Sequence, residues 1–152
     1  MIAPAALAGG LAGTLTVASI HESLRRVTQD APRMDILDME LIRKCQKSLN
    51  KEELGEYQLQ QWAIGGELFC DTAYYSLAGM GGGKDVWLRG ALLGLVAGVS
   101  AVVLPKPLGL PQEPSNKTTG TQLMIMTIGL YLTGGLVAAA ITQLVDSAER
   151  NT

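Results

Sequence analysis

Two acidic residues, Glu67 and Asp71, stand four positions apart within a mostly apolar stretch. This spacing places both carboxylates on one face of a helix. Neighbouring carboxylates repel each other, and the repulsion is relieved when the pair shares a proton or binds a cation. Tyr74 and Tyr75 follow on the same half of the helix and offer hydroxyl donors. We therefore predict that these four residues form an ion- or proton-binding site. The structural alternative is a polar cluster in which the acids are protonated or hydrogen-bonded.

Other chemistry-bearing patterns are incomplete. His21, the only histidine, precedes Glu22, but a zinc-protease helix needs a second histidine where the chain has Arg25. The glycine run before Lys84 has neither the leading glycine nor the following Ser or Thr of a phosphate loop. No nucleophile–base set can be assembled, and Cys45 and Cys70 fall in different environments. We predict no catalytic residue, no metal site and no cofactor, and we regard an enzyme as less favoured than a non-enzyme.

The residues that follow the first apolar stretch are rich in cationic side chains. Long basic side chains near the end of a membrane span can reach lipid headgroups. Glu22 also precedes Arg26 by four residues, the favourable order for a helical ion pair. We predict contacts with membrane lipid headgroups, or a more specific phosphate pocket, for His21, Arg25, Arg26 and Arg33.

The charged residues are confined to blocks. Residues 1–20, 90–104 and 121–145 contain no charged side chain, whereas residues 21–58 contain seven of the twelve basic and eight of the fourteen acidic residues. A soluble helical domain carries charges on the outer face of every helix, and a bilayer core of about 30 Å requires about 20 apolar residues per helix. We predict one domain over residues 1–152, an all-α integral membrane four-helix bundle with spans at about 3–20, 59–78, 86–104 and 123–144.

The segment 21–58 is expected to be amphipathic. The first helix should continue to Val27, and apolar residues at helical spacing over 34–49 predict an additional helix that lies in the membrane interface or packs on the bundle. Asn50 and Glu53 resemble a capping box that opens the next helix. Residues 79–83 predict a tight turn, four prolines predict an extended loop over residues 105–120, and Asp146 is expected to begin a polar tail.

The basic residues predict an orientation. The side with residues 21–58 and the loop 105–121 carries nine Lys and Arg residues, against three on the other side. The richer side is expected to be cytoplasmic, which places both termini outside the cytoplasm. Trp62 and Trp87 then mark opposite interfaces. No basic residue precedes the first apolar run, so we interpret that run as a retained span and not as a signal peptide.

Small residues recur at four-residue spacing in three of the predicted spans. Gly90, Gly94 and Gly98 form such a stripe, and similar stripes occur in the first and last spans. Because lipid is as apolar as leucine, membrane helices associate through the close packing that small residues allow. The stripes therefore predict packing within one chain. The alternative is a homo-oligomer that associates through Gly90, Gly94 and Gly98.

Three motifs together resemble an uncharacterised group of small bacterial four-span membrane proteins. They are His-Glu-x-x-Arg-Arg at residues 21–26, Ala-Pro-Arg-Met-Asp at 31–35 and Asp-Thr-Ala-Tyr-Tyr-Ser-Leu at 71–77. The resemblance covers most of the chain and implies a multi-pass protein of the bacterial inner membrane. It implies no activity and no site residue.

Three functional hypotheses follow. The first is a small membrane bundle that transports or conducts a cation or proton with Glu67 and Asp71. The second is a structural or accessory subunit that binds a partner's membrane span through the polar face of its own second span. The third is a lipid-modifying enzyme. The chain has no strongly basic or acidic tail, so we predict no nucleic-acid partner.

Overall fold

The structure is a computed structural model that describes residues 4–27, 34–50, 52, 54–81, 84–110 and 117–151. The described residues form five α-helices: α1 (Pro4–Val27), α2 (Met34–Ser48), α3 (Glu56–Ser76), α4 (Val86–Val103) and α5 (Lys117–Arg150). A 3₁₀ turn, η1 (Leu77–Gly79), follows α3. The prediction of an all-α fold is confirmed.

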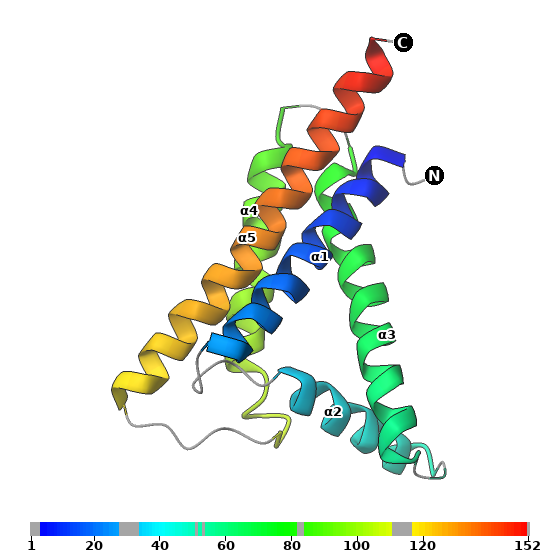
Figure 1. Ribbon diagram of the computed structural model, residues 1–152, viewed down its shortest axis with the longest axis vertical. Helices are drawn as coiled ribbons and strands as arrows, with labels where there is room; N and C mark the ends of the chain where they lie inside the picture. Colours follow the sequence, from blue (N-terminus) through cyan, green and yellow to red (C-terminus); the bar gives the residue numbers. More distant parts are fainter. Residues whose placement is uncertain are drawn as a thin grey trace.

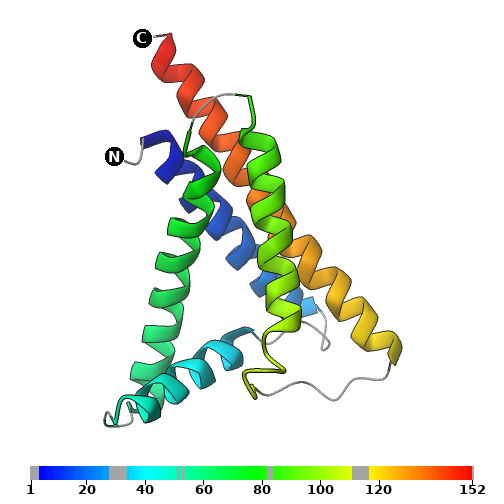
Figure 2. The same cartoon turned by 180° about the vertical axis from the view of Figure 1, so that it is seen from behind.

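The helices diverge from one end of the molecule (Figure 1). Both α1 and α4 pack along α5, while α3 contacts mainly α1 and meets α4 and α5 to a smaller extent. The N-terminal half of α3 points away from α4 and α5, and α2 crosses that open end and packs on α3 (Figure 2). The start of α1 and the end of α5 lie together at the opposite end (Figure 1).

The glycine stripe of α4 packs against α5 of the same chain. A Cβ atom built on Gly94 would lie 2.6 Å from the carbonyl oxygen of Tyr131, and one on Gly98 would lie 2.7 Å from the Cα atom of Ile128. Gly90 meets the backbone of Gly135 equally closely. All three glycines are buried. Packing within the chain therefore occupies this stripe, and a homo-oligomer, which stays a prediction, would need another surface.

The seam between α1 and α5 is built in the same way. A Cβ atom on Gly13 would lie 2.6 Å from the carbonyl oxygen of Gly134, and Gly9 lies against Ala138 and Thr142. At such short backbone separations, Cα–H groups can approach carbonyl and hydroxyl oxygens of the facing helix. The small residues of α1, α4 and α5 thus allow three backbones to pack at close range.

Large apolar side chains point outward from these tightly packed helices. They include Leu7, Leu11 and Leu15 on α1 and Leu88, Leu92, Val96, Val99 and Val103 on α4. Among the described helices, α4 and the segment Gly120–Arg150 of α5 are long and apolar enough to cross a membrane. The helices α1 and α3 do not meet that criterion: α1 contains many glycines and threonines, and α3 contains acids and glutamines. Two of the four predicted spans are therefore supported by length and composition.

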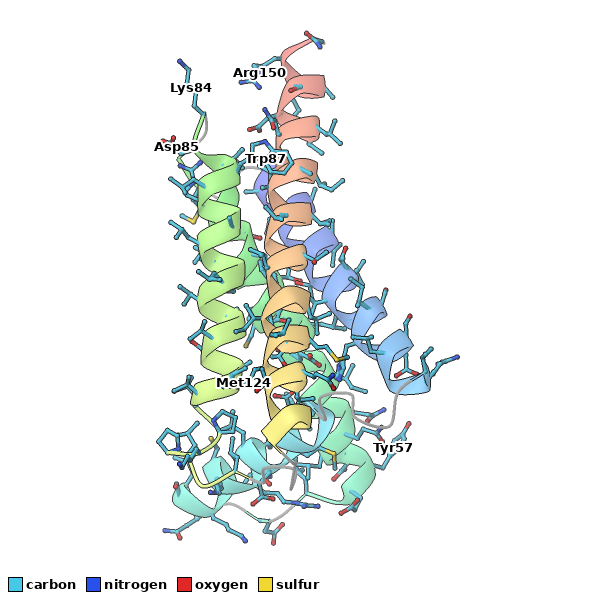
Figure 3. The ribbon with its side chains drawn as sticks, turned by 90° about the vertical axis from the view of Figure 1, so that its left-hand side faces the viewer. Tyr57, Lys84, Asp85, Trp87, Met124 and Arg150 are labelled. Atoms are coloured by element: carbon cyan, nitrogen blue, oxygen red, sulfur yellow. The ribbon has the colours of Figure 1, made fainter. Side chains whose placement is uncertain are left out.

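Trp87 and Tyr57 lie at opposite ends of the molecule, near the starts of α4 and α3 (Figure 3). Because α3 and α4 run in opposite directions, their first residues lie at opposite ends of the molecule. The predicted separation of the two tryptophans is consistent with it, because Trp62 lies one and a half turns beyond Tyr57 on α3.

Asn50 ends one helix and does not begin the next. Its φ of 51° is left-handed, and its backbone N–H donates to the carbonyl oxygen of Lys47 at 3.3 Å, in the manner of a residue just beyond a helix C-terminus. The predicted capping box is therefore wrong. Helix α3 starts at Glu56 after Gly55, without a side-chain cap, and Glu53 lies outside the described residues. The expected helices up to Val27 and over residues 34–49 are both found.

Helix α5 is longer than predicted at both ends. It begins at Lys117 and continues to Arg150, so part of the predicted loop 105–120 and the predicted polar tail from Asp146 are helical. The reason is that no proline or glycine follows Asp146, and polar residues can continue a helix beyond its apolar portion. Turns occupy residues 104–109, and residues 111–116 lie outside the described part of the chain.

Alanine at Gly94 should destabilise the bundle, whereas alanine at Gly129 should not. The new Cβ at position 94 would collide with α5, which typically costs about 1–3 kcal/mol. Nothing lies within 4 Å of a Cβ at Gly129, so Gly129→Ala should gain up to ~1 kcal/mol of helix propensity. Unfolding of both variants in detergent, followed by circular dichroism, would test this. Equal stability of the two variants would contradict the packing described.

Candidate functional site

The two acids lie on the inner face of α3. Leu59, Ala63, Glu67, Asp71 and Tyr75 follow one another at four-residue spacing, which places them along one side of the helix. Leu59, Ala63 and Tyr75 are buried, and the two acids between them are half-buried. The carboxylates therefore face the rest of the molecule, as the sequence-based hypothesis requires.

The opposite face of α3 is exposed. Trp62 is 66% exposed and Phe69 is 76% exposed. Cys70 and Ala73 are also exposed, and a Cβ atom on Gly66 would meet nothing within 4 Å. This helix thus separates an apolar outer face from an inner face that carries acidic groups.

Tyr131 of α5, which the sequence analysis did not identify, packs against the buried cluster that contains Tyr75 and lies within electrostatic range of the acids. The charges of Asp71 and Glu67 act on its hydroxyl, as does the charge of Asp38 from α2. Tyr131 stands about sixty residues from the acids as a lone tyrosine in an apolar span, so no spacing pattern connects it with them. Its hydroxyl is no distinguishing signal either, because several threonines stand in the same stretch.

The hydroxyl groups of Tyr74 and Tyr75 bind backbone carbonyls of other helices. Tyr75 donates to the carbonyl oxygen of Tyr131 on α5 at 2.9 Å, and Tyr74 donates to the carbonyl oxygen of Leu93 on α4 at 2.8 Å. The two rings also meet edge to face, with centroids 5.5 Å apart. Each hydroxyl has a single hydrogen. In this arrangement, these tyrosines attach α3 to α4 and α5 and do not donate to the acids.

A second polar contact joins α3 to α1. Thr72 donates to the hydroxyl of Thr14 at 3.4 Å, and Thr14 in turn donates to the carbonyl oxygen of Gly10 at 3.0 Å. Ser76 bonds back to the carbonyl oxygen of Thr72 at 2.7 Å. Of these three bonds, the one between Thr72 and Thr14 crosses between helices, and together with the tyrosines it holds the C-terminal half of α3 at the end where the helices converge.

The acidic pair offers chemistry limited to proton or cation binding. Glu67 acts electrostatically on Asp71, so the two carboxylates form one unit. Within the described part of the chain, no group of three or more His, Cys, Asp or Glu side chains could hold a metal ion. Two carboxylates with hydroxyl-bearing neighbours can share a proton or bind a single cation.

Of the four predicted headgroup residues, the structure describes the side chains of His21 and Arg26, and the predicted contact with lipid headgroups stays a prediction. Arg26 pairs with Glu22 at 2.9 Å, as its spacing predicted, and both side chains are exposed. His21 is half-buried near the end of α1. The side chain of Arg25 and all of Arg33 lie outside the described part.

Comparison of the chain with protein-family models, curated proteins and solved structures found no match. Its function is therefore inferred from the geometry of this chain alone. The resemblance to small bacterial membrane proteins stays a prediction.

Removal of the Tyr75 hydroxyl should loosen α3. Tyr75→Phe keeps the ring and loses one interhelical hydrogen bond, which should lower the free energy of unfolding by about 1 kcal/mol. Tyr74→Phe should act in the same direction. Tyr57 is exposed, and its hydroxyl accepts only from Gln61 one turn away, so Tyr57→Phe should change stability by less than about 0.5 kcal/mol. Denaturation in detergent would rank the three variants, and an equal effect at positions 57 and 75 would contradict the attachment.

Proposed function

We propose that the protein is a four-span membrane bundle that binds and transfers a cation or proton at Glu67 and Asp71. The observation that carries this proposal is the orientation of α3. Its two acids face inward, while Trp62 and Phe69 face outward. An ionised carboxylate at the centre of a bilayer costs at least about 2.5–3.5 kcal/mol, so acids in membrane helices normally face the bundle interior or water.

Helix length supports four passages. With a rise of about 1.5 Å per residue, the 24 residues of α1 extend about 36 Å and the 21 residues of α3 about 31 Å, close to the ~30 Å of a bilayer core. The helices α4 and α5 meet the length and composition criterion directly. Four passages agree with the placement of the start of α1 and the end of α5 at one end (Figure 1).

The distribution of basic residues supports an orientation in the membrane. Arg43, Lys44, Lys47 and Lys106 lie at the end of the molecule where α2 crosses. In a bacterial inner membrane, this end would face the cytoplasm and both termini would lie outside it. Helix α2 would then stand at the cytoplasmic mouth of the bundle.

Under this proposal, the carboxylates and the tyrosines of the site have different roles. The carboxylates hold the proton or cation, because they are the ionisable groups of the inner face. Tyr74 and Tyr75 position α3 through the carbonyls of α4 and α5. A hydroxyl oxygen that donates its hydrogen still has a lone pair. Either tyrosine can therefore also accept a hydrogen bond from a protonated carboxyl group.

Neutralisation of the acidic pair should abolish transport. Wild-type protein in liposomes should show a flux driven by a pH or cation gradient, and Glu67→Gln combined with Asp71→Asn should remove it. A pH-sensitive or cation-sensitive dye inside the liposomes would report the flux.

The matched control is Asp146→Asn combined with Glu149→Gln. This variant makes the same change of charge near the end of α5, outside the proposed site, and should retain the flux. Equal flux in the wild type and the Glu67/Asp71 variant, or no flux in the wild type with any cation tested, would refute the transport function.

A second candidate function is that of an accessory subunit of a membrane complex. The outer face of α3 favours it. A Cβ atom built on Gly65 or Gly66 would meet nothing within 4 Å, so packing within this chain does not require glycine there. Because glycine weakens a helix, a partner that packs closely on this face would explain both glycines. Because the acids face inward, a partner would contact this apolar face and not the polar one that the sequence analysis expected. The same face is also open to a second copy of the chain.

The accessory function predicts a distinct outcome. Gly66→Leu should release the protein from a membrane complex isolated from its native host, whereas Gly129→Leu, also at an open glycine, should not. Co-purification in mild detergent would measure this. Retention of the partner by both variants, or the absence of any partner, would exclude this face as the interface.

A further inference from the structure

Helix α2 leaves its apolar stripe uncovered. Leu41 is 42% exposed and Leu49 is 70% exposed, and Cys45 between them is also exposed. These residues follow one another at four-residue spacing on one side of the helix. Sequence alone left open whether this stripe packs on the bundle or faces lipid. In the structure, the bundle does not cover it.

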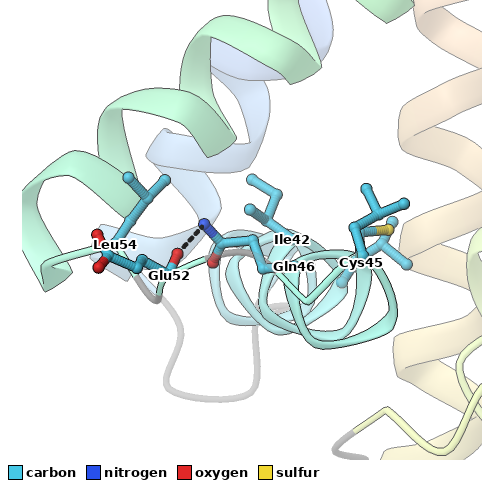
Figure 4. A pocket seen from close by; sticks show the side chains of 7 residues that line it. Ile42, Cys45, Gln46, Glu52 and Leu54 are labelled. Atoms are coloured by element: carbon cyan, nitrogen blue, oxygen red, sulfur yellow. Dashed lines mark hydrogen bonds between the residues drawn. The ribbon is translucent and has the colours of Figure 1, made fainter.

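The stripe lines a cavity of about 600 Å³. Its walls are formed mainly by apolar side chains: Leu41, Ile42, Cys45, Leu49 and Leu54, with Gln46 and Glu52 at the polar edge. Figure 4 shows Ile42 and Leu54 pointing to the same side of α2, and Gln46 bonded through its amide to the carbonyl oxygen of Glu52. The volume falls within the ~300–1,000 Å³ that is usual for small-molecule sites.

The protein holds the polar side of α2 in place. Arg43 forms an ion pair with Glu56, at the start of α3, at 2.6 Å. Lys44 donates to the carbonyl oxygens of Leu108 and Gly109, in the turn after α4, at 2.6 and 2.7 Å. These contacts span from α3 to α4, so α2 cannot rotate to bury its apolar stripe without breaking them.

We propose that this cavity holds a hydrocarbon chain of a phospholipid from the leaflet on the α2 side. The proposal deepens the proposed four-span arrangement and rests on it, but it does not depend on transport. The cavity lies between α2 and the segment that follows it up to Leu54. In the four-span arrangement, this side of the bundle would face the membrane surface and the adjoining lipid chains. Apolar walls then favour a hydrocarbon occupant over water.

The charge of Lys44 complements the phosphate of such a lipid. Carbonyl oxygens satisfy two of its three N–H groups but carry no formal charge. None of the ion pairs found among the described residues includes Lys44. Lys44 does not line the cavity, but it follows Leu41 by one helical turn. Its remaining donor can therefore reach the phosphate of a lipid whose chain occupies the cavity.

Native mass spectrometry can count the retained lipid. Protein would be extracted from vesicles of phosphatidylethanolamine and phosphatidylglycerol as wild type, Cys45→Trp and Cys70→Trp. An indole at position 45 fills the cavity, whereas an indole at position 70 lies on the exposed outer face of α3. We expect the wild type and Cys70→Trp to retain one phospholipid more than Cys45→Trp. The same number in all three proteins would overturn the proposal.

A second measurement does not require the large substitution. A nitroxide would be attached to single cysteines at positions 45, 47 and 49 in vesicles, with the other native cysteines changed to serine. Labels at 45 and 49 should collide with oxygen in preference to a water-soluble nickel chelate, by several-fold relative to position 47 on the opposite side of α2. Preference for nickel at 45 and 49, or shielding of both from either reagent, would also overturn the proposal.

A label at Cys70 separates this proposal from the one on which it rests. If Cys70 collides with oxygen while Cys45 collides with nickel, the four-span arrangement holds and the lipid cavity does not. If both labels collide with nickel, the four-span arrangement itself fails. Equal flux in the wild type and the Glu67/Asp71 variant would refute the transport function without changing the collision pattern of either label, so that failure is distinguishable from both outcomes.

Discussion

The close approach of helix backbones around α5 is the constraint on which the rest of this structure depends. Glycines on α1 and α4 meet the backbone of α5 at distances that no Cβ atom could occupy. Such contacts require small residues on both sides of a seam, and they leave the large apolar side chains to point outward. The helices α1, α4 and α5 therefore pack on one another at close range. The C-terminal half of α3 approaches the backbone of α1 equally closely at Gly10 and is also held by its tyrosine side chains.

That attachment explains where the polar groups of α3 lie. Its C-terminal half is held by the hydroxyls of Tyr74 and Tyr75 on two neighbouring helices. Its N-terminal half diverges and is held by α2 instead. The acidic pair stands between these two regions, on the inner face of the helix. The cavity that α2 lines is separate from this inner face, because its walls come from α2 and from the segment that follows it up to Leu54.

Sequence reasoning succeeded where the pattern is local. The amphipathic helix after the first apolar stretch, the Glu22–Arg26 pair and the inward placement of Glu67 and Asp71 follow from residue type and helical spacing. It failed at helix ends. Asn50 could start a helix or end one, and only the conformation of the surrounding chain decides between the two. The limits of α5 were likewise underestimated, because an apolar stretch need not coincide with the helix that contains it.

The sequence by itself determined the helical periodicity, the segregation of charge and the positions of the small residues, because each depends on neighbours within a few turns of the chain. Only the tertiary structure decided which face met which helix. It packed Tyr131 against the cluster that contains Tyr75, directed the hydroxyl donors of Tyr74 and Tyr75 to backbone carbonyls, and used the glycine stripe of α4 within the chain. It also left the stripe of α2 uncovered. These outcomes depend on how α3 and α2 fit the space that remains around three tightly packed helices, and no local pattern encodes that space. The acidic pair was thus readable in the sequence, but its surroundings were not.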